Sequence, residues 1–249
     1  MSYAYDEGTI FWPTARVFEF EIVEAGTSDA GYYYAANSFC TAEHGGTHLD
    51  APIHFGEGRQ TVAEVPLDRL VGPAVIVDVS AAAEARPEYL VVPDDFEAWE
   101  DEHGRIPDGA IVLVRTGWGA RWPDRGRYLG TTLTGAAAVP ELRFPGLHPE
   151  GARWLVENRR IDAVGIDTAS IGGGERGGEG PQPLDPSGVP VSVRTHQVLA
   201  AEDLPAFENV AALDRLPPTG AYVVALPMKI GRGSGGPIRI AGVIPGTGG

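Results

Sequence analysis

Three histidines and an aspartate of the same parity lie within eleven residues near the start of the chain: His44, His48, Asp50 and His54. In an extended backbone, side chains two residues apart project from the same face, so all four would share one side. The protein has only six histidines, and this segment holds half of them. Imidazole nitrogens with a carboxylate oxygen suit Zn²⁺ or Mn²⁺. The segment therefore predicts a metal site; the alternative is a strand with polar residues on its solvated face.

Distances along such a strand show where the segment must bend. His48 and Asp50 would lie about 7 Å apart at ~3.3 Å per residue, so their side chains could reach one ion. His44 and His54 would lie more than about 30 Å apart on the same rise, so the chain must curl at both ends. The two glycines after His44 and the proline before His54 stand at these bends, since glycine permits unusual backbone angles and proline ends strand pairing.

Residues 44–54, His-Gly-Gly-Thr-His-Leu-Asp-Ala-Pro-Ile-His, closely resemble a family signature. The signature is the His-x-Gly-Thr-His-x-Asp-x-Pro-x-His motif of the cyclase family of metal-dependent hydrolases, which includes bacterial kynurenine formamidases and isatin hydrolases. Every fixed position matches. The resemblance implies that His44, His48 and Asp50 bind metal, with the aspartate bridging two ions. It also implies that His54 donates and accepts protons.

The same family carries a histidine followed twelve residues later by a glutamate, and His196 and Glu208 have this spacing. The resemblance makes both residues metal ligands, and Glu208 is the next candidate proton carrier if His54 proves to be a ligand. From the residues alone, a short helix runs from His196 to about Glu202 and breaks before Pro205, because a residue preceding proline disfavours helical angles. An unbroken helix would hold the pair about 18 Å apart at 1.5 Å per residue, so the break is what could bring them together. Taken alone, the pair favours another explanation, in which His196 caps an ordinary surface helix and Glu208 is solvated; beside the first motif, a second metal-binding cluster is favoured instead.

Other segments extend the resemblance over most of the chain. Residues 165–170 are similar to a Gly-Ile-Asp-Thr-Pro-Ser turn, with Ala169 in place of the proline. Trp12, followed by proline, resembles a tryptophan whose indole contacts the aromatic substrate in the formamidases, although core packing would explain it as well. The glycine-rich residues 171–180 occupy a stretch that is commonly shorter, and they lack the lysine and following helix of a nucleotide site. They are either a mobile lid over the metal pocket or a disordered surface loop.

Hydrophobic patterns predict strands alternating with fewer helices. Short, β-branched apolar runs predict buried strands at 72–79, 109–115, 163–167 and 220–227. Strict alternation predicts a half-exposed strand over 16–23. Residues 93–103 begin with proline and acids, and residues 149–158 carry apolar residues at helical spacing, so both predict helices. These patterns indicate an α/β fold with a mixed β-sheet and flanking helices. The resemblance implies the cyclase-like swivelling β/β/α architecture, assembled as a homodimer or larger homo-oligomer.

The composition excludes several classes of protein. With 34 acidic and 19 basic residues, a net charge of −15 argues against nucleic acid or anionic membranes as partners. No apolar stretch approaches the ~20 residues of a spanning helix, and the N-terminus lacks a signal-peptide pattern, so a cytoplasmic location is expected. Without a long linker or internal repeat, residues 1–249 are expected to form a single domain. Cys40, the only cysteine, is expected to be a small buried apolar residue.

The functional hypothesis is metal-dependent hydrolysis of a carbon–nitrogen acyl bond. One or two Zn²⁺ or Mn²⁺ ions would lower the pKa of bound water from about 15.7 to about 7, and His54 would carry a proton to the leaving nitrogen. By resemblance the substrate is a small aromatic amide such as N-formylkynurenine. A cyclic amide of the isatin type is the nearest alternative, less favoured because isatin hydrolases lack the glutamate that Glu208 matches. A polyketide-type cyclase is a third possibility. A metal-dependent binding protein without turnover is the alternative of another class, against which the spare histidine argues.

Overall fold

The computed structural model describes residues 1–176 and 184–246. Seven strands close into a barrel in the order β10-β11-β3-β9-β8-β6-β4. Their bounds are β3 His48–Asp50, β4 Val71–Asp78, β6 Ile111–Arg115, β8 Ala163–Ile166, β9 Ala206–Glu208, β10 Ala221–Pro227 and β11 Gly235–Val243. The pairs from β4 through β6 and β8 to β9 are parallel, and the pairs that complete the ring are antiparallel. The predicted mixed sheet is confirmed, and its two edges meet.

The four strands predicted to be buried are β4, β6, β8 and β10, each within two residues of its predicted bounds. Strand β10 is buried on one face only, because Tyr222 and Leu226 on its other face are exposed. Successive side chains on β6 alternate between two buried clusters: Ile111 and Leu113 fill the barrel interior, while Val112 and Val114 pack in the cluster outside it. Helical residues such as Phe96 and Leu155 complete the outer cluster. Because both faces of the strand are covered, its sequence is a continuous apolar run without polar alternation.

Within the described residues, five α-helices flank the barrel: α1 Ser80–Ala85, α2 Pro93–His103, α3 Arg125–Leu129, α4 Pro149–Asn158 and α5 Val191–Ala201. Helices α2 and α4 have the predicted bounds. Helix α5 begins five residues before His196, where the prediction placed its start. Its first turns hold β-branched residues of low helix propensity, and their burial against the core stabilises them instead, as for Val191 and Thr195.

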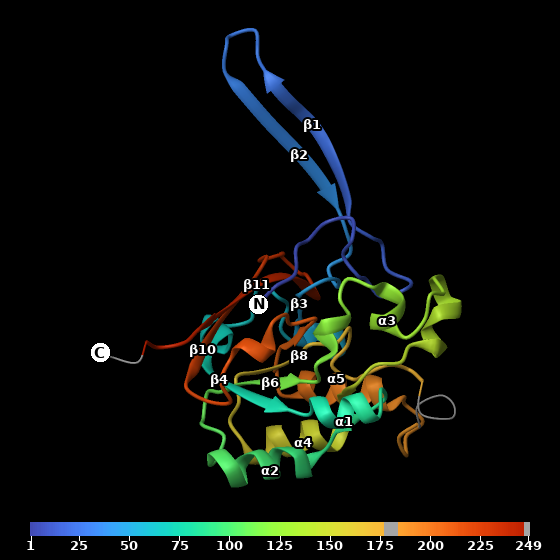
Figure 1. The fold of residues 1–249 in the computed structure, drawn as a ribbon, viewed down its shortest axis with the longest axis vertical. Coiled ribbons are helices and arrows are strands. Elements are labelled where there is room, and N and C mark those ends of the chain that lie inside the picture. The colour runs from blue at the N-terminus through green and yellow to red at the C-terminus, as the bar shows by residue number, and fades with distance from the viewer. Residues whose placement is uncertain (177–183, 247–249) are drawn as a thin grey trace.

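A two-stranded antiparallel hairpin of β1 Glu19–Thr27 and β2 Tyr33–Cys40 projects from the body of the protein (Figure 1). We call residues 17–40 the arm. The predicted strand over 16–23 is therefore present in part, but every residue of β1 is exposed, so the expected buried face is wrong. The reason is that β1 pairs only with β2 and no layer of its own chain covers either face. Cys40, at the end of β2, is likewise exposed and not buried as expected.

The first part of the glycine-rich stretch is packed into the body. Residues 171–174 are buried, and a Cβ added to Gly172 would lie 2.2 Å from the carbonyl oxygen of Ser192 on α5. This close approach of two backbones requires glycine, so these residues are not a surface loop. Residues 177–183 lie outside the described residues, and the prediction of a lid or a disordered loop falls there. No helix in the described part of the chain has both the length and the apolar character to span a membrane.

Candidate metal centre

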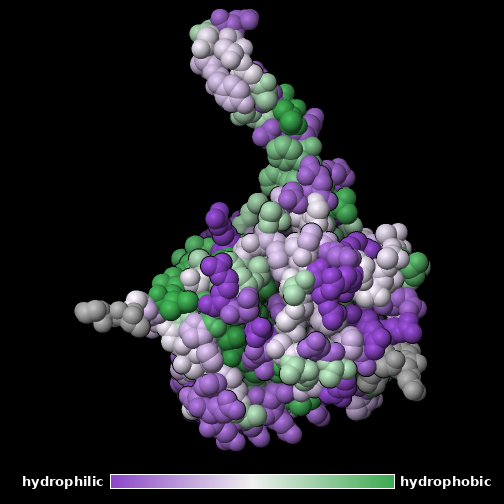
Figure 2. Space-filling model, in the orientation of Figure 1, coloured by the Kyte–Doolittle hydropathy of each residue, from purple (hydrophilic) through white to green (hydrophobic). Residues whose placement is uncertain are grey.

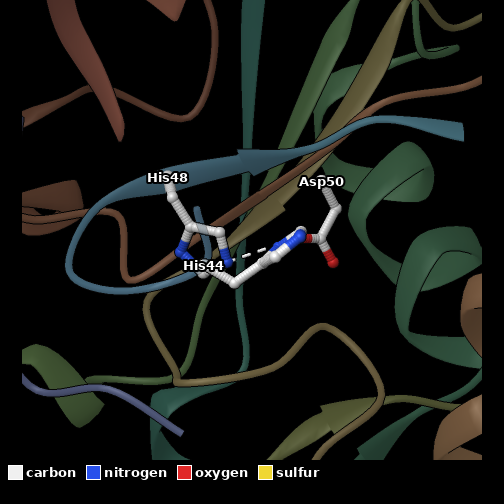
Figure 3. A group of neighbouring side chains, drawn as sticks. All are labelled: His44, His48 and Asp50. Atoms are coloured by element: carbon white, nitrogen blue, oxygen red, sulfur yellow. Dashed lines mark hydrogen bonds and ion pairs between the residues drawn. The ribbon is translucent and has the colours of Figure 1, made fainter. Parts of the chain in front are cut away.

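Three of the predicted side chains converge at the short central strand β3 (Figure 3). His48 and Asp50 are on β3, which is paired on one side with β9 and on the other with β11. Gly46 has a φ of +55°, so the chain turns just before β3 and brings His44 back toward Asp50. Nδ1 of His44 lies 2.7 Å from Oδ1 of Asp50, and Nε2 of His48 lies 3.2 Å from the same oxygen. The predicted bend is thus present.

The second predicted cluster joins the first. Pairing of β9 with β3 places Glu208 opposite His48, and α5 supplies His196. Nε2 of His196 is 3.3 Å from Oε1 of Glu208 and 3.6 Å from Oδ2 of Asp50. The chain reverses after α5, as the break before Pro205 predicts. The potential ligand atoms form two groups, each within 4.8 Å: His44, His48 and Asp50 in one, Asp50, His196 and Glu208 in the other. Asp50 belongs to both groups.

Backbone carbonyls orient two of the imidazoles. Nδ1 of His48 donates to the carbonyl oxygen of Gly46, and Nδ1 of His196 donates to that of Ser192, both at 2.9 Å. A carbonyl can only accept, so each Nδ1 carries a proton and each Nε2 faces the carboxylates, where it can hold a proton or bind a metal cation. Without a proton or a metal cation between them, the lone pair of each Nε2 and the facing carboxylate oxygens repel one another.

Two side chains, Ser234 and Glu43, orient the imidazole of His44 so that one of its nitrogens faces Asp50. Ser234 donates its hydroxyl to Glu43 at 2.7 Å, so its oxygen can accept from Nε2 of His44 at 2.9 Å. This arrangement leaves Nδ1 of His44 facing Asp50, so this nitrogen could exchange its hydrogen bond to the carboxylate for a metal ion. Sequence reasoning did not identify Ser234 or Glu43, because the serine is 190 residues from His44 and no local pattern links them.

Burial and charge make this cluster a site for positive charge. Asp50 and Glu208 are 6% and 4% exposed, and no lysine or arginine is among the described residues that line the cavity beside them. Burial alone would lower the pKa of His48, but its hydrogen bond to Asp50 and the two carboxylate charges raise it to about 9. Burial would raise the pKa of Asp50, but His44 and His48 hold it well below its usual range. Buried carboxylates need compensating cations, so the donor set fits one or two divalent ions.

His54 lies beside the cluster but outside both ligand groups. It ends a 3₁₀ turn, Pro52–His54, and its ring stacks on His44 with centroids 3.9 Å apart and planes at 20°. Burial lowers the pKa of His54 to about 4. Positive charge on the neighbouring imidazoles also lowers this pKa, whereas the negative charge of Asp50 raises it. The imidazole is therefore neutral at neutral pH and can accept a proton. This position agrees with the predicted role of His54, which stays a prediction.

The cluster lies at one side of a cavity of about 380 Å³ with mostly apolar walls. Aromatic and aliphatic side chains line it: Ile10, Phe11, Trp12, Phe55 and Val193. Trp12 also packs against a core cluster that contains Trp118 and Phe144, so both explanations of this residue are compatible with its position. An apolar cavity of this size with polar groups gathered at one side suits a small aromatic molecule.

Comparison with known proteins agrees with this geometry. The model of the Cyclase family matches residues 1–172. The chain belongs to the cyclase family. One relative in that family, the isatin hydrolase of Roseibium aggregatum, is 32% identical over 223 residues, which cover 86% of this chain and 77% of the relative. The kynurenine formamidase of Salinibacter ruber is 30% identical over 201 residues, 79% of this chain and 74% of the relative.

Solved structures of similar proteins have the same fold as this chain. Isatin hydrolase A from Labrenzia aggregata, bound to benzyl benzoate, superposes with a TM-score of 0.82 at 30% identity, covering 98% of this chain and 91% of that one. Isatin hydrolase A from Ralstonia solanacearum gives a TM-score of 0.81 at 28% identity, with 98% and 90% coverage. The predicted cyclase-like architecture is confirmed. The named cyclase-family relatives are hydrolytic enzymes, so turnover is favoured over a binding role alone.

Substitution of Gly235 should test whether close packing against this glycine keeps His44 in position to bind metal. Gly235 lies opposite Asp50 across the β3–β11 pair, and an added Cβ would be 2.5 Å from Cε1 of His44 and 2.5 Å from the carbonyl oxygen of Leu49. Gly235→Ala should therefore displace His44 and weaken metal binding by roughly 10- to 100-fold, as loss of a ligand-orienting contact does. Isothermal titration with Mn²⁺ or Zn²⁺ measures this. Gly231→Ala, where no atom lies within 4 Å of the new Cβ, is the control.

The contribution of the second group can be tested separately. His196→Ala and Glu208→Gln should each lower metal stoichiometry, or lower affinity at least about tenfold, while the fold persists. Chelator lowers the melting temperature of a protein whose site joins separate segments, so this drop should shrink in both variants. Glu202→Gln, on an exposed carboxylate just after α5, should behave as wild type. If both site variants also match wild type, the twelve-residue spacing has no role in metal binding.

Proposed function

We propose that the protein hydrolyses a carbon–nitrogen acyl bond in a small aromatic amide, with one or two divalent cations held by five ligands: His44, His48, Asp50, His196 and Glu208. The observation that carries the proposal is the sharing of Asp50 between two ligand groups at one side of an apolar cavity. A divalent cation supplies hydroxide at neutral pH and polarises a carbonyl. Zn²⁺ and Mn²⁺ both accept this ligand set.

The protein's own residues would perform the remaining tasks. His54, neutral at neutral pH and next to the ligand groups, would move a proton to the leaving nitrogen. Phe11, Trp12 and Phe55 on the cavity wall would hold the aromatic ring of the substrate and exclude water. Glu208 would act mainly as a ligand, because its Oε1 already accepts from the amide of Ile171 at 2.7 Å.

Two forms of substrate follow from the same chemistry. Hydrolysis of a linear aryl formamide, as in kynurenine formamidases, releases formate and an amine. Hydrolysis of a cyclic amide, as in isatin hydrolases, opens the ring and releases one product. The presence of Glu208 beside His196 supports the first form. The 32% identity to an isatin hydrolase and the TM-score of 0.82 support the second.

Turnover assays on the metal-loaded protein test the proposal. N-formylkynurenine and isatin should be offered at equal concentration with Mn²⁺ and then Zn²⁺, and formate release should be measured beside loss of substrate. Substrate loss with equimolar formate identifies the linear amide, and loss without formate identifies the cyclic one. Retention of an aromatic ligand with no loss of either substrate would overturn the proposal in favour of a binding protein.

We propose that the chain forms a single domain, because its cavity draws on residues from Ile10 to Asn209. The homo-oligomeric assembly and the cytoplasmic location expected from the sequence stay predictions.

A further inference from the structure

A third carboxylate lines the cavity beside the ligand groups. Glu175 is on the cavity wall but belongs to neither ligand group. Figure 2 shows hydrophilic side chains over much of the visible face of the body, below the arm, where water solvates them. The cavity walls are mostly apolar, so a carboxylate there needs a partner of its own. The proposed reaction gives Glu175 no task.

The backbone on both sides of Glu175 is fixed. The amide of Gly174 donates to the carbonyl oxygen of Phe144 at 3.0 Å, and the amide of Arg176 donates to the carbonyl oxygen of Leu142 at 2.9 Å. A Cβ added to Gly174 would lie 2.4 Å from the carbonyl oxygen of Leu142, so the two segments are also closely packed. These contacts hold Glu175 in a defined position at the cavity wall.

Ser192 orients the carboxylate of Glu175 and connects it with the second ligand group. The buried hydroxyl of Ser192 donates to Oε1 of Glu175 at 2.9 Å, and its carbonyl oxygen accepts from Nδ1 of His196 at 2.9 Å. Ser192 and His196 are about one turn apart on α5, a rise of about 6 Å. A carboxylate accepts several hydrogen bonds, so Glu175 can accept another from a ligand. One small aromatic molecule can therefore reach both Glu175 and the ligand groups.

The cavity offers Glu175 no cationic side chain among the described residues. Neither lysine nor arginine occurs among those that line it, and the residues outside the described ranges contain neither. The adjacent Arg176 pairs with Glu141 instead. The ion pairs printed by the geometry for the cavity histidines are with Asp50 and Glu208. A cation carried by the substrate would supply the missing partner.

We propose that Glu175 binds an ammonium group of the substrate. The inference rests on the proposed function and narrows the substrate to an aromatic amide whose ring carries a short side chain ending in an amine, since alkylamines are protonated at neutral pH. Glu175 would accept a charge-assisted hydrogen bond from the ammonium group while the amide lies at the ligand groups. Among its described residues the cavity has no lysine or arginine to pair with a substrate carboxylate. The class is therefore an amine and not an amino acid.

Binding of ligands without an amide bond to the metal-loaded protein tests this inference apart from turnover. Three 2-aminophenyl ketones differ only in the side chain on the ketone: ethyl is neutral, 2-aminoethyl is cationic and 2-carboxyethyl is anionic. Isothermal titration should give the cationic ligand a dissociation constant about 10- to 100-fold below that of the neutral one, the range that a hydrogen bond to a charged group contributes. The anionic ligand should gain nothing over the neutral one. Tightest binding of the anionic ligand, or no preference for the cationic one, would overturn the proposal.

Two substitutions test whether the preference comes from Glu175. Glu175→Gln should remove it, because the amide can still accept from Ser192 but carries no charge. Glu175→Lys should reverse it in favour of the anionic ligand. Glu157→Gln, on an exposed carboxylate of α4 that does not line the cavity, is the matched control and should bind all three ligands as wild type does. A preference for the cation that persists in Glu175→Gln would assign it to another group.

Turnover of a neutral substrate separates this inference from the proposed function. The N-formyl derivative of the ethyl ketone has the linear amide but no amine. If wild type hydrolyses it and the titrations show no preference for the cationic ligand, the proposed function holds and the inference is wrong. If the cationic ligand is preferred but neither a formamide nor isatin is hydrolysed, the proposed function is wrong and Glu175 is the cation site of a binding protein.

Discussion

Asp50→Asn should lose more metal affinity than any other single substitution at the site. Asp50 is the one residue common to both ligand groups, with His44 at 2.7 Å and His48 at 3.2 Å from its Oδ1. Asparagine has nearly the same shape, but a neutral amide cannot bridge two cations as a carboxylate does. Loss of residues that merely orient ligands costs 10- to 100-fold in metal affinity, so loss of a shared ligand should exceed about 100-fold.

Elemental analysis of the purified Asp50→Asn variant, with activity measured in parallel, gives the result directly. Metal per chain and turnover should fall together. Asp108→Asn, on an exposed carboxylate far along the chain, controls for the charge change and should retain both. An unchanged metal content in Asp50→Asn would remove Asp50 from the site and with it the shared-ligand arrangement.

Substitution of His54 should separate chemistry from coordination. The imidazole is stacked on His44 but belongs to neither ligand group. His54→Ala should therefore retain bound metal and lose about 10²- to 10⁴-fold in kcat, the usual contribution of a positioned acid or base. His54→Asn should behave similarly, because it restores polarity without a ring nitrogen that can take up and release a proton.

Two outcomes with the His54 variants would contradict this expectation. If either is isolated without metal, His54 is a ligand and Glu208 becomes the first candidate for the proton carrier. If both retain full activity on the best substrate, the proposed proton transfer is wrong even with the metal site intact. Metal content and kcat must therefore be measured on the same preparations.

Much of this centre follows from local sequence. The even spacing of His48 and Asp50, with a glycine pair before them and Pro52 after them, predicts side chains that share one face and a segment that curls at its ends. Both features are present because they depend only on the backbone geometry of neighbouring residues. Helices α2 and α4 and the four apolar barrel strands were predictable for the same reason, since their periodicity is contained within each element.

Long-range contacts decided the rest. No local pattern specifies that the sheet closes into a barrel, that Glu208 lies opposite His48, or that Ser234 orients His44 from 190 residues away. The first turns of α5 are helical through burial and not through propensity. Along β1, the alternating pattern indicates an apolar face but not what covers it, and this chain leaves that face exposed. Sequence by itself therefore determined the ligand types, their local spacing and the apolar elements. Only the tertiary structure decided which of them meet, because that depends on packing among segments that are distant along the chain.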